Sequence, residues 1–243
     1  QVLFDFEHVE IARGPQTTYQ GAPNIGGTVS LQRTKPTGEY EATTRVSAGE
    51  YDRREADAVV NFPLTESLAG KVSFSWTDGG GDYLKNVASG RSENDEDRLA
   101  ISTSFHWQLN DSFSAQYTYD NENDNSDTPG LLNISTDTDL VCIISLNNET
   151  CGSAKGPAIP QTGSIERTAQ NFSNSREYEG SYHTLRMDLE WNDNILTSIT
   201  GFRNTEVEMD RDVDATHINF YSMNSEQDYD QFTQELRLAG QYS

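Results

Sequence analysis

Residues 97–121, DRLAISTSFHWQLNDSFSAQYTYDN, alternate between apolar and polar side chains on both sides of a short turn. The apolar positions are Leu99, Ile101, Phe105 and Trp107 before the turn, and Phe113, Ala115, Tyr117 and Tyr119 after it. Successive side chains of a β-strand point to opposite faces, so this pattern predicts two strands that each have an apolar and a polar face. The turn at residues 109–111 is short enough only for an antiparallel pair.

The same alternation recurs along the rest of the chain and predicts eight strands. They cover approximately residues 39–49, 53–64, 67–78, 97–108, 112–121, 181–191, 195–209 and 232–238. After the third predicted strand, the connections alternate between long and short. Such sorting is typical of a barrel in an outer membrane, because only one rim faces the outside. A β-sandwich would also have short strands, but it has no reason to sort its loops in this way. We therefore predict an all-β fold that is part of a large antiparallel transmembrane β-barrel.

Composition narrows the possible functions. The 243 residues carry a net charge of −22 at pH 7, which argues against nucleic acid as a partner. No apolar stretch approaches the roughly 18 to 20 residues that a transmembrane helix needs. Acidic residues cluster at 93–97, 120–127 and 210–214, between predicted strands, and indicate solvated loops or a divalent-cation site. No pairing of a nucleophile with a base and no phosphate-binding loop indicates an enzyme.

Two cysteines, Cys142 and Cys151, lie within the longest predicted connection. We expect them to form a local disulfide, which fits an oxidising compartment such as the periplasm or the cell surface. No histidine or further cysteine lies close to them in the sequence, so a zinc site is not expected.

Residues 1–36 do not follow the strand rhythm and contain a long motif instead. They read EHVEIARGPQ at 7–16, YQGAPNIGGTVSL at 19–31 and RTKP at 33–36. This segment resembles the end of the plug domain of TonB-dependent outer-membrane receptors, in which such a motif leads directly into the first barrel strand. The stretches LTSITGFR at 196–203 and QELRL at 234–238 agree with the resemblance. Thr17, Thr18 and Pro23 depart from the usual family pattern, in a part of the motif that we expect to be a turn.

The resemblance implies a division of the chain. Residues 1–36 would be the C-terminal part of the plug domain. Residues 37–243 would be the N-terminal part of a transmembrane barrel with long extracellular loops. A barrel of this class has about 22 strands, so we expect the chain to be a fragment. It opens at Gln1 without a leader and ends in what resembles an interrupted strand.

The implied function is TonB-dependent active import of a scarce nutrient, a ferric siderophore first of all, across the bacterial outer membrane. Haem, cobalamin or a glycan is the alternative cargo, and a passive porin or a small closed barrel is an alternative to active import. The implied partners are the TonB energy-coupling complex, through a box absent from these residues, the nutrient itself and outer-membrane lipid. No cofactor and no enzymatic activity are expected.

Arg13 is the first candidate functional residue. An arginine buried between plug and barrel would need carboxylate partners, because an unpaired buried charge is very costly. Glu10 and Glu235 are the candidate partners, and an exposed turn residue is the alternative interpretation.

Five further residues are candidates for contact with the ligand, because cations and aromatic rings suit anionic iron complexes. They are Tyr19, Gln20, Tyr83, Lys85 and Arg91. Ordinary loop surface explains each of them equally well. In the same N-terminal segment, Val9, Ile11, Val29 and Leu31 suit short strands buried in a small plug core.

Overall fold

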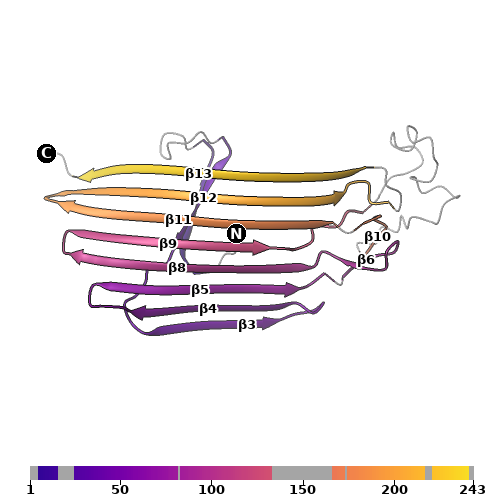
Figure 1. The fold of residues 1–243 in the computed structure, drawn as a ribbon, viewed down its shortest axis with the longest axis horizontal. Coiled ribbons are helices and arrows are strands. Elements are labelled where there is room, and N and C mark those ends of the chain that lie inside the picture. The colour runs from indigo at the N-terminus through magenta and orange to yellow at the C-terminus, as the bar shows by residue number, and fades with distance from the viewer. Residues whose placement is uncertain are drawn as a thin grey trace.

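The computed structural model describes residues 5–15, 25–81, 83–132, 166–172, 174–216 and 221–240. Over these residues the structure is all-β, and Figure 1 shows one wide sheet with a separate hairpin crossing behind it. Within the described part of the chain, no helix is long and apolar enough to cross a membrane.

The wide sheet contains eight antiparallel strands in the order β13-β12-β11-β9-β8-β5-β4-β3. Their bounds are β3 (Glu41–Ala48), β4 (Arg54–Pro63), β5 (Leu68–Gly79), β8 (Glu96–Asn110), β9 (Phe113–Asp124), β11 (Ser175–Trp191), β12 (Asn194–Asp212) and β13 (Ser222–Gly240). All eight strands predicted from the sequence are confirmed. β11 and β13 begin earlier than predicted because their first residues are mostly polar or charged, which interrupts the apolar alternation while the backbone ladder continues.

Among the described residues, five further strands lie outside the wide sheet. β1 (Phe6–Arg13) and β2 (Gly27–Arg33) form the N-terminal hairpin. β10 (Arg167–Thr168), β6 (Leu84–Asn86) and β7 (Ser92–Glu93) form a three-stranded sheet at one end of the wide sheet. Residues 79–96 were expected to form a loop, and strands of two or three residues are too short to show an alternating pattern in the sequence.

The hairpin strands form as expected, but their apolar side chains are not buried. Val9 pairs with Leu31 and Ile11 pairs with Val29 across the hairpin. Ile11 and Val29 are 67% and 62% exposed, so the described hairpin alone forms no buried core, and burial of these side chains in a plug stays a prediction. The reason is that a two-stranded hairpin has no second layer of its own to cover its apolar side chains.

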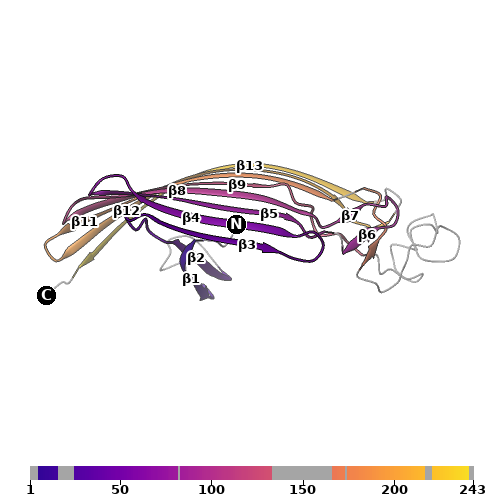
Figure 2. The ribbon, with the colours of Figure 1, turned by 90° about the horizontal axis from the view of Figure 1, so that it is seen from below.

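The wide sheet is curved, and the hairpin lies on its concave side (Figure 2). Register places Lys71 of β5 beside Ser104 of β8, and Ser104 beside Thr118 of β9, so these polar residues share one face. The contacts of Lys71 with the N-terminal segment identify this polar face as the concave one. The opposite, convex face carries exposed apolar side chains: Val60, Phe74, Ile101, Trp107, Phe202, Phe232 and Leu236. The sheet is therefore polar toward the hairpin and apolar toward the outside, the reverse of a water-soluble protein.

The two rims of the sheet differ. One rim has the short turns at residues 64–67, 111–112 and 192–193, and we call it the short-turn rim. The other, the long-loop rim, has the connections 49–53, 80–95, 125–174 and 213–221, of which only the first is short. Trp107 and Trp191 are exposed near the short-turn rim, as expected of aromatic residues at a membrane interface.

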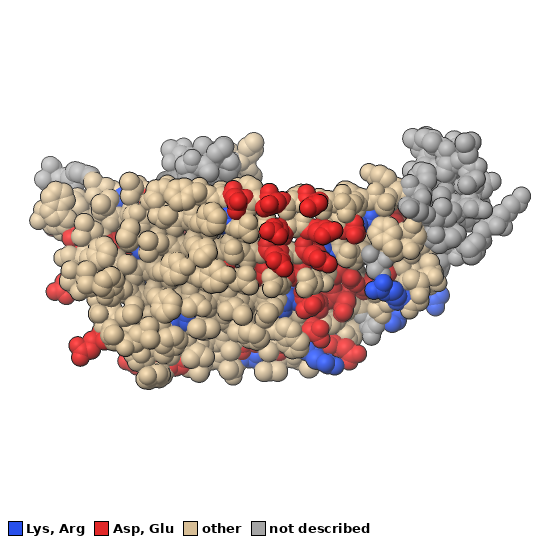
Figure 3. Space-filling model, in the orientation of Figure 1, with Lys and Arg blue, Asp and Glu red and all other residues tan. Residues whose placement is uncertain are grey.

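Acidic side chains gather on the convex face toward the long-loop rim, beyond the apolar part of the same strands (Figure 3). Those on β11, β12 and β13 include Glu177, Glu179, Glu206, Glu208, Glu226 and Asp228. The apolar band of the convex face therefore ends at a row of carboxylates.

Candidate functional site

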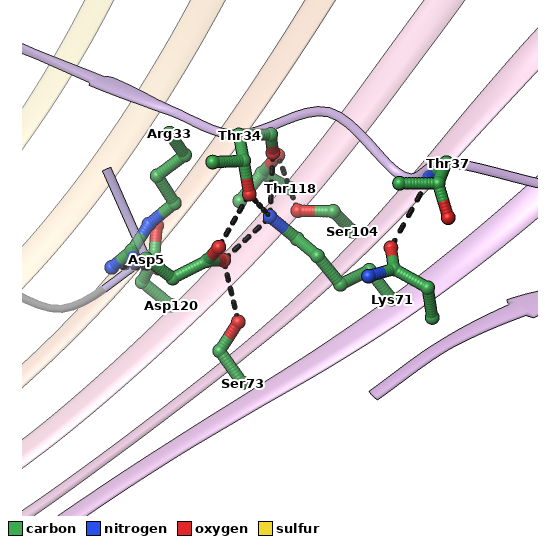
Figure 4. Close-up of polar contacts among 10 residues, drawn as sticks. Asp5, Arg33, Thr34, Thr37, Lys71, Ser73, Ser104, Thr118 and Asp120 are labelled. Atoms are coloured by element: carbon green, nitrogen blue, oxygen red, sulfur yellow. Dashed lines mark hydrogen bonds and ion pairs between the residues drawn. The ribbon is translucent and has the colours of Figure 1, made fainter. Parts of the chain in front are cut away.

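A buried polar cluster fastens the N-terminal segment to the concave face, and we call it the anchor cluster. It consists of Asp5, which precedes β1, Thr34, which follows β2, and Lys71 and Ser73 on β5. Lys71 Nζ lies 2.5 Å from Asp5 Oδ2, 2.5 Å from the carbonyl oxygen of Thr34 and 2.7 Å from Thr34 Oγ1. Figure 4 shows the carboxylate of Asp5 and the hydroxyl of Thr34 converging on the ammonium group of Lys71.

The hydrogen-bonding groups of the anchor cluster are satisfied. The ammonium group of Lys71 has three N–H donors, and each has an oxygen acceptor within the cluster. Asp5 Oδ2 also accepts a hydrogen bond of 2.6 Å from Ser73 Oγ, and its Oδ1 accepts one from Thr34 Oγ1. The side chains of Lys71 and Asp5 are only 1% and 4% exposed. Charges this deeply buried are tolerable because they are paired and hydrogen-bonded.

Two further contacts hold the same segment on either side of the anchor cluster (Figure 4). Arg33 Nη2, at the end of β2, lies 2.7 Å from Asp120 Oδ1 on β9. The backbone N–H of Thr37 donates to Asn61 Oδ1 on β4 at 3.2 Å. The segment from Arg33 to Thr37 thus contacts three strands of the sheet, and this geometry suits mechanical attachment rather than chemistry on a substrate.

The ion pair between Arg33 and Asp120 is less buried than the anchor cluster, with side chains 18% and 20% exposed. We expect Arg33→Gln to weaken attachment of the segment by about 1 kcal/mol, because a partly solvated pair contributes modestly. Hydrogen exchange of the β2 amides in the full-length protein measures the change. An exchange rate equal to that of the wild type would show that this pair does not hold the segment.

The structure places the predicted ion-pairing residues apart from the anchor cluster. Arg13 ends β1 with an exposed side chain, and Glu10 lies on the same strand. Residues three apart on a strand point to opposite faces, so their side chains diverge. Glu235 of β13 forms an ion pair with Arg237 of the same strand. The role of Arg13 in pairing plug with barrel stays a prediction.

Three of the predicted ligand-contact residues lie together on the long-loop rim, in or beside the hairpin of β6 and β7. The hydroxyl of Tyr83 accepts a hydrogen bond of 2.8 Å from Asn94 Nδ2. Lys85 Nζ donates to Ser92 Oγ at 2.7 Å, and Arg91 is exposed. Contact of these residues with a ligand stays a prediction. Tyr19, Gln20, Cys142 and Cys151 lie outside the described residues.

Charged side chains near the long-loop rim form ion pairs and have shifted pKa values. Arg53 Nη1 lies 3.0 Å from Glu96 Oε1, and its Nη2 lies 2.8 Å from Glu55 Oε1. Hydrogen bonds to Glu96 and Glu55 raise the pKa of Arg53 above its ordinary value. Burial raises the pKa of the Asp127 carboxyl. Among the described residues, no group of three or more histidine, cysteine or acidic side chains is placed to hold a metal ion, so the acidic loops show no cation site there.

The anchor residues were not singled out from the sequence. The polar face of β5 was predicted, and it carries one lysine among serines. Because a buried cation needs a paired anion, this lysine could have been predicted to contact an acidic residue inside the barrel. Asp5 gave no such signal, since nothing in the sequence places it beside Lys71.

Sequence comparison relates part of the chain to known receptors. No model of a known protein family matches the chain. It is 35% identical over 105 residues to the metal-pseudopaline receptor CntO of Pseudomonas aeruginosa, covering 42% of this chain and 14% of that protein. It is 36% identical over 62 residues to the ferripyoverdine receptor of Pseudomonas aeruginosa, covering 26% of this chain and 8% of that protein.

Comparison with solved structures extends the likeness to the whole chain. The ferric yersiniabactin uptake receptor FyuA of Yersinia pestis matches 100% of this chain, with a TM-score of 0.76 and 16% identity. The siderophore receptor PiuA of Acinetobacter baumannii matches 99% of it, with a TM-score of 0.73 and 14% identity. The chain has the fold of a TonB-dependent siderophore receptor. The eight-stranded sheet corresponds to part of the receptor barrel.

The chain is much shorter than these receptors. It covers 34% of the FyuA chain and 33% of the PiuA chain. The named relatives are transport receptors rather than enzymes, which agrees with the expectation that the chain is not an enzyme.

Proposed function

We propose that this chain is part of an outer-membrane importer that takes up a ferric siderophore or a similar metal complex, driven by TonB. The observation that carries the proposal is the anchor cluster, which fixes a separate N-terminal segment against the polar face of a sheet whose other face is apolar. A passive pore gains nothing from a segment fastened across its interior, whereas a gated importer requires one.

We propose the same division of the chain that the sequence predicts. We assign residues 1–36 to the C-terminal part of the plug and residues 37–243 to the first strands of the barrel. Support comes from the separate β1–β2 hairpin, from its position on the concave side (Figure 2), and from Thr34 and Thr37, which contact the sheet where the chain passes from one part to the other.

The proposed location is the bacterial outer membrane, with the convex face in lipid and the long-loop rim outside. The exposed apolar side chains of the convex face support the first assignment, and the unequal rims support the second. The carboxylates at the edge of the apolar band would then lie at the outer boundary of the membrane (Figure 3).

The names of the relatives support a metal chelate as the cargo. The two receptors that align with part of this chain are named for metal-pseudopaline and ferripyoverdine. Haem, cobalamin or a glycan would be a different cargo of the same kind of importer, and uptake measurements distinguish them.

The test uses the full-length receptor in a strain that lacks its own siderophore receptors. We expect it to import radiolabelled iron from ferripyoverdine, or metal from metal-pseudopaline, and to lose import when tonB is deleted while binding at the cell surface persists. Import that continues without TonB would identify a passive porin. Absence of both binding and import for these chelates would overturn the proposed cargo class.

A further inference from the structure

A set of deeply buried side chains lies at the base of the loops of the long-loop rim, and we call it the loop core. Its polar members are at most 1% exposed: Asn86, Glu93, Gln170, Asn174, Asp212 and Thr216. Its buried apolar members are Leu84, Ala169 and Ala215. These residues come from the connections 80–95 and 125–174, and from the end of β12 with the connection 213–221. Connecting segments usually run separately over the protein surface, so a core shared by three of them is unusual.

Asn86 joins the connection 80–95 to the connection 125–174. Its side-chain amide donates to Glu93 Oε1 at 2.9 Å and to the carbonyl oxygen of Gln170 at 2.8 Å. Asn86 Oδ1 accepts from the backbone N–H groups of Ala88 and Ser89, at 3.0 and 3.3 Å. An asparagine side chain has two donors and room for two donors at its oxygen, so its hydrogen-bonding capacity is filled. The bond to Gln170 crosses 84 positions of the sequence.

Backbone hydrogen bonds strengthen the same link, and Figure 1 shows β6 and β10 beside each other at the end of the wide sheet. The N–H group of Lys85 donates to the carbonyl oxygen of Glu166 at 2.9 Å, and that of Val87 to Thr168 at 2.8 Å. Thr168 Oγ1 donates in turn to the carbonyl oxygen of Leu131 at 2.7 Å. The connections 80–95 and 125–174 therefore share both backbone and side-chain bonds.

Asp212 joins the connection 125–174 to the connection 213–221. Its Oδ2 accepts from the backbone N–H of Asn171 at 2.8 Å. Its Oδ1 accepts from the backbone N–H groups of Asp214 and Ala215, at 3.1 and 2.9 Å. The backbone N–H of Asp212 donates to Asn174 Oδ1 at 2.7 Å. One buried residue thus holds the backbone of both connections.

We propose that the loop core makes the described parts of these three connections one cooperative unit, which opens as a whole rather than loop by loop. Opening of one connection alone would leave buried donors and acceptors of the next without partners, which is costly. The unit includes Tyr83, Lys85 and Arg91, so these residues are coupled to the distant connection 213–221. The inference goes beyond the proposed import, and its test requires no ligand.

Native-state hydrogen exchange of the wild-type full-length receptor in detergent micelles is the first test. The backbone N–H groups of Lys85, Val87, Asn171 and Asp212 each donate to an acceptor from another connection. Amides of one cooperative unit exchange through the same opening. As the denaturant concentration rises, we expect the opening free energies of these four amides to converge on one value. Four values that stay separate would overturn the cooperative unit.

Two isosteric variants disturb the loop core at opposite ends. Asn86→Asp keeps acceptor oxygens but can no longer donate to Gln170, and Asp212→Asn replaces one of two acceptor oxygens by a donor. Asn125→Asp and Asp95→Asn make the same chemical changes at exposed positions of the same rim and serve as controls. Heat-modifiable migration in gels checks that each barrel is folded. The convergence in the wild type decides the question for any variant that does not fold.

We expect Asn86→Asp to speed exchange at Asn171 and Asp212 about tenfold, and Asp212→Asn to do the same at Lys85 and Val87. A tenfold change corresponds to about 1.4 kcal/mol, which is within reach of one lost hydrogen bond to a charged group. The controls should change these rates less than about twofold, as substitutions away from such contacts usually do.

Faster exchange confined to the substituted connection would overturn the cooperative unit and leave the importer proposal intact. Coupled exchange in a receptor that imports no metal chelate would support the loop core and count against the proposed cargo alone. The two proposals can therefore fail separately.

Discussion

Lys71→Met will detach the N-terminal segment from the barrel wall. The substitution removes the cation that faces Asp5 at 2.5 Å and leaves a carboxylate that is 4% exposed without its charge partner. Breaking a buried ion pair from one side costs about 3–5 kcal/mol, chiefly because the remaining charge is stranded away from water. We expect faster hydrogen exchange of the β2 amides and of Thr34 in the full-length receptor, and increased entry of vancomycin into cells.

A double variant distinguishes two effects of Lys71→Met, the unpaired charge that it leaves on Asp5 and the packing contacts that it removes. Asp5→Asn combined with Lys71→Met removes both charges, and asparagine tolerates the left-handed backbone that Asp5 adopts at φ = 61°. We expect the double variant to exchange more slowly than Lys71→Met alone. Lys85→Met is the matched control, because the same chemical change at an exposed position of β6 strands no charge in the anchor cluster. Equal exchange in Lys71→Met and in this control would show that the anchor cluster does not hold the segment.

The anchor cluster illustrates which parts of a site can be read from this sequence. The alternation of residues 67–78 predicted that Lys71 and Ser73 share a polar face, and the structure confirms it. The partner Asp5 is separated from Ser73 by 68 positions and directly precedes β1, a strand of another sheet. A pairing at that separation depends on where the hairpin sits against the wall, and no local pattern encodes that position.

The fold, like the anchor cluster, was predictable where a local sequence pattern encodes it and not elsewhere. Strands with regular alternation, such as β5, β8 and β9, were predicted nearly to their ends. β13 was predicted only over its apolar end, because most of its first residues, from Ser222 to Asp230, are polar or charged and show no regular apolar alternation. Backbone hydrogen bonds extend that strand along β12 regardless of side-chain polarity, so periodicity alone could not locate its start.

Phe232→Arg will destabilise the inserted barrel by about 2–4 kcal/mol, because it places a charge on the lipid-facing side near the middle of a strand. Phe232 pairs with Phe202 of β12, and their side chains are 67% and 44% exposed on the convex face. The measurement is a denaturant titration of the full-length receptor folded in phospholipid vesicles, with a folded-to-unfolded gel shift as the readout.

Two arginine substitutions on the same strand serve as controls for Phe232→Arg. Thr233→Arg points to the polar concave face and should cost less than about 1 kcal/mol, because the charge remains in water. Asp228→Arg stays on the convex face but lies four residues farther toward the long-loop rim, beside the carboxylates of Glu206 and Glu226. There the membrane interface makes the cost about 0–1 kcal/mol, and the neighbouring carboxylates offset part of it. A cost that depends on both face and depth would be the signature of a lipid-embedded strand. Equal costs at all three positions would contradict a membrane location for the convex face, and with it the barrel to which the N-terminal segment is anchored.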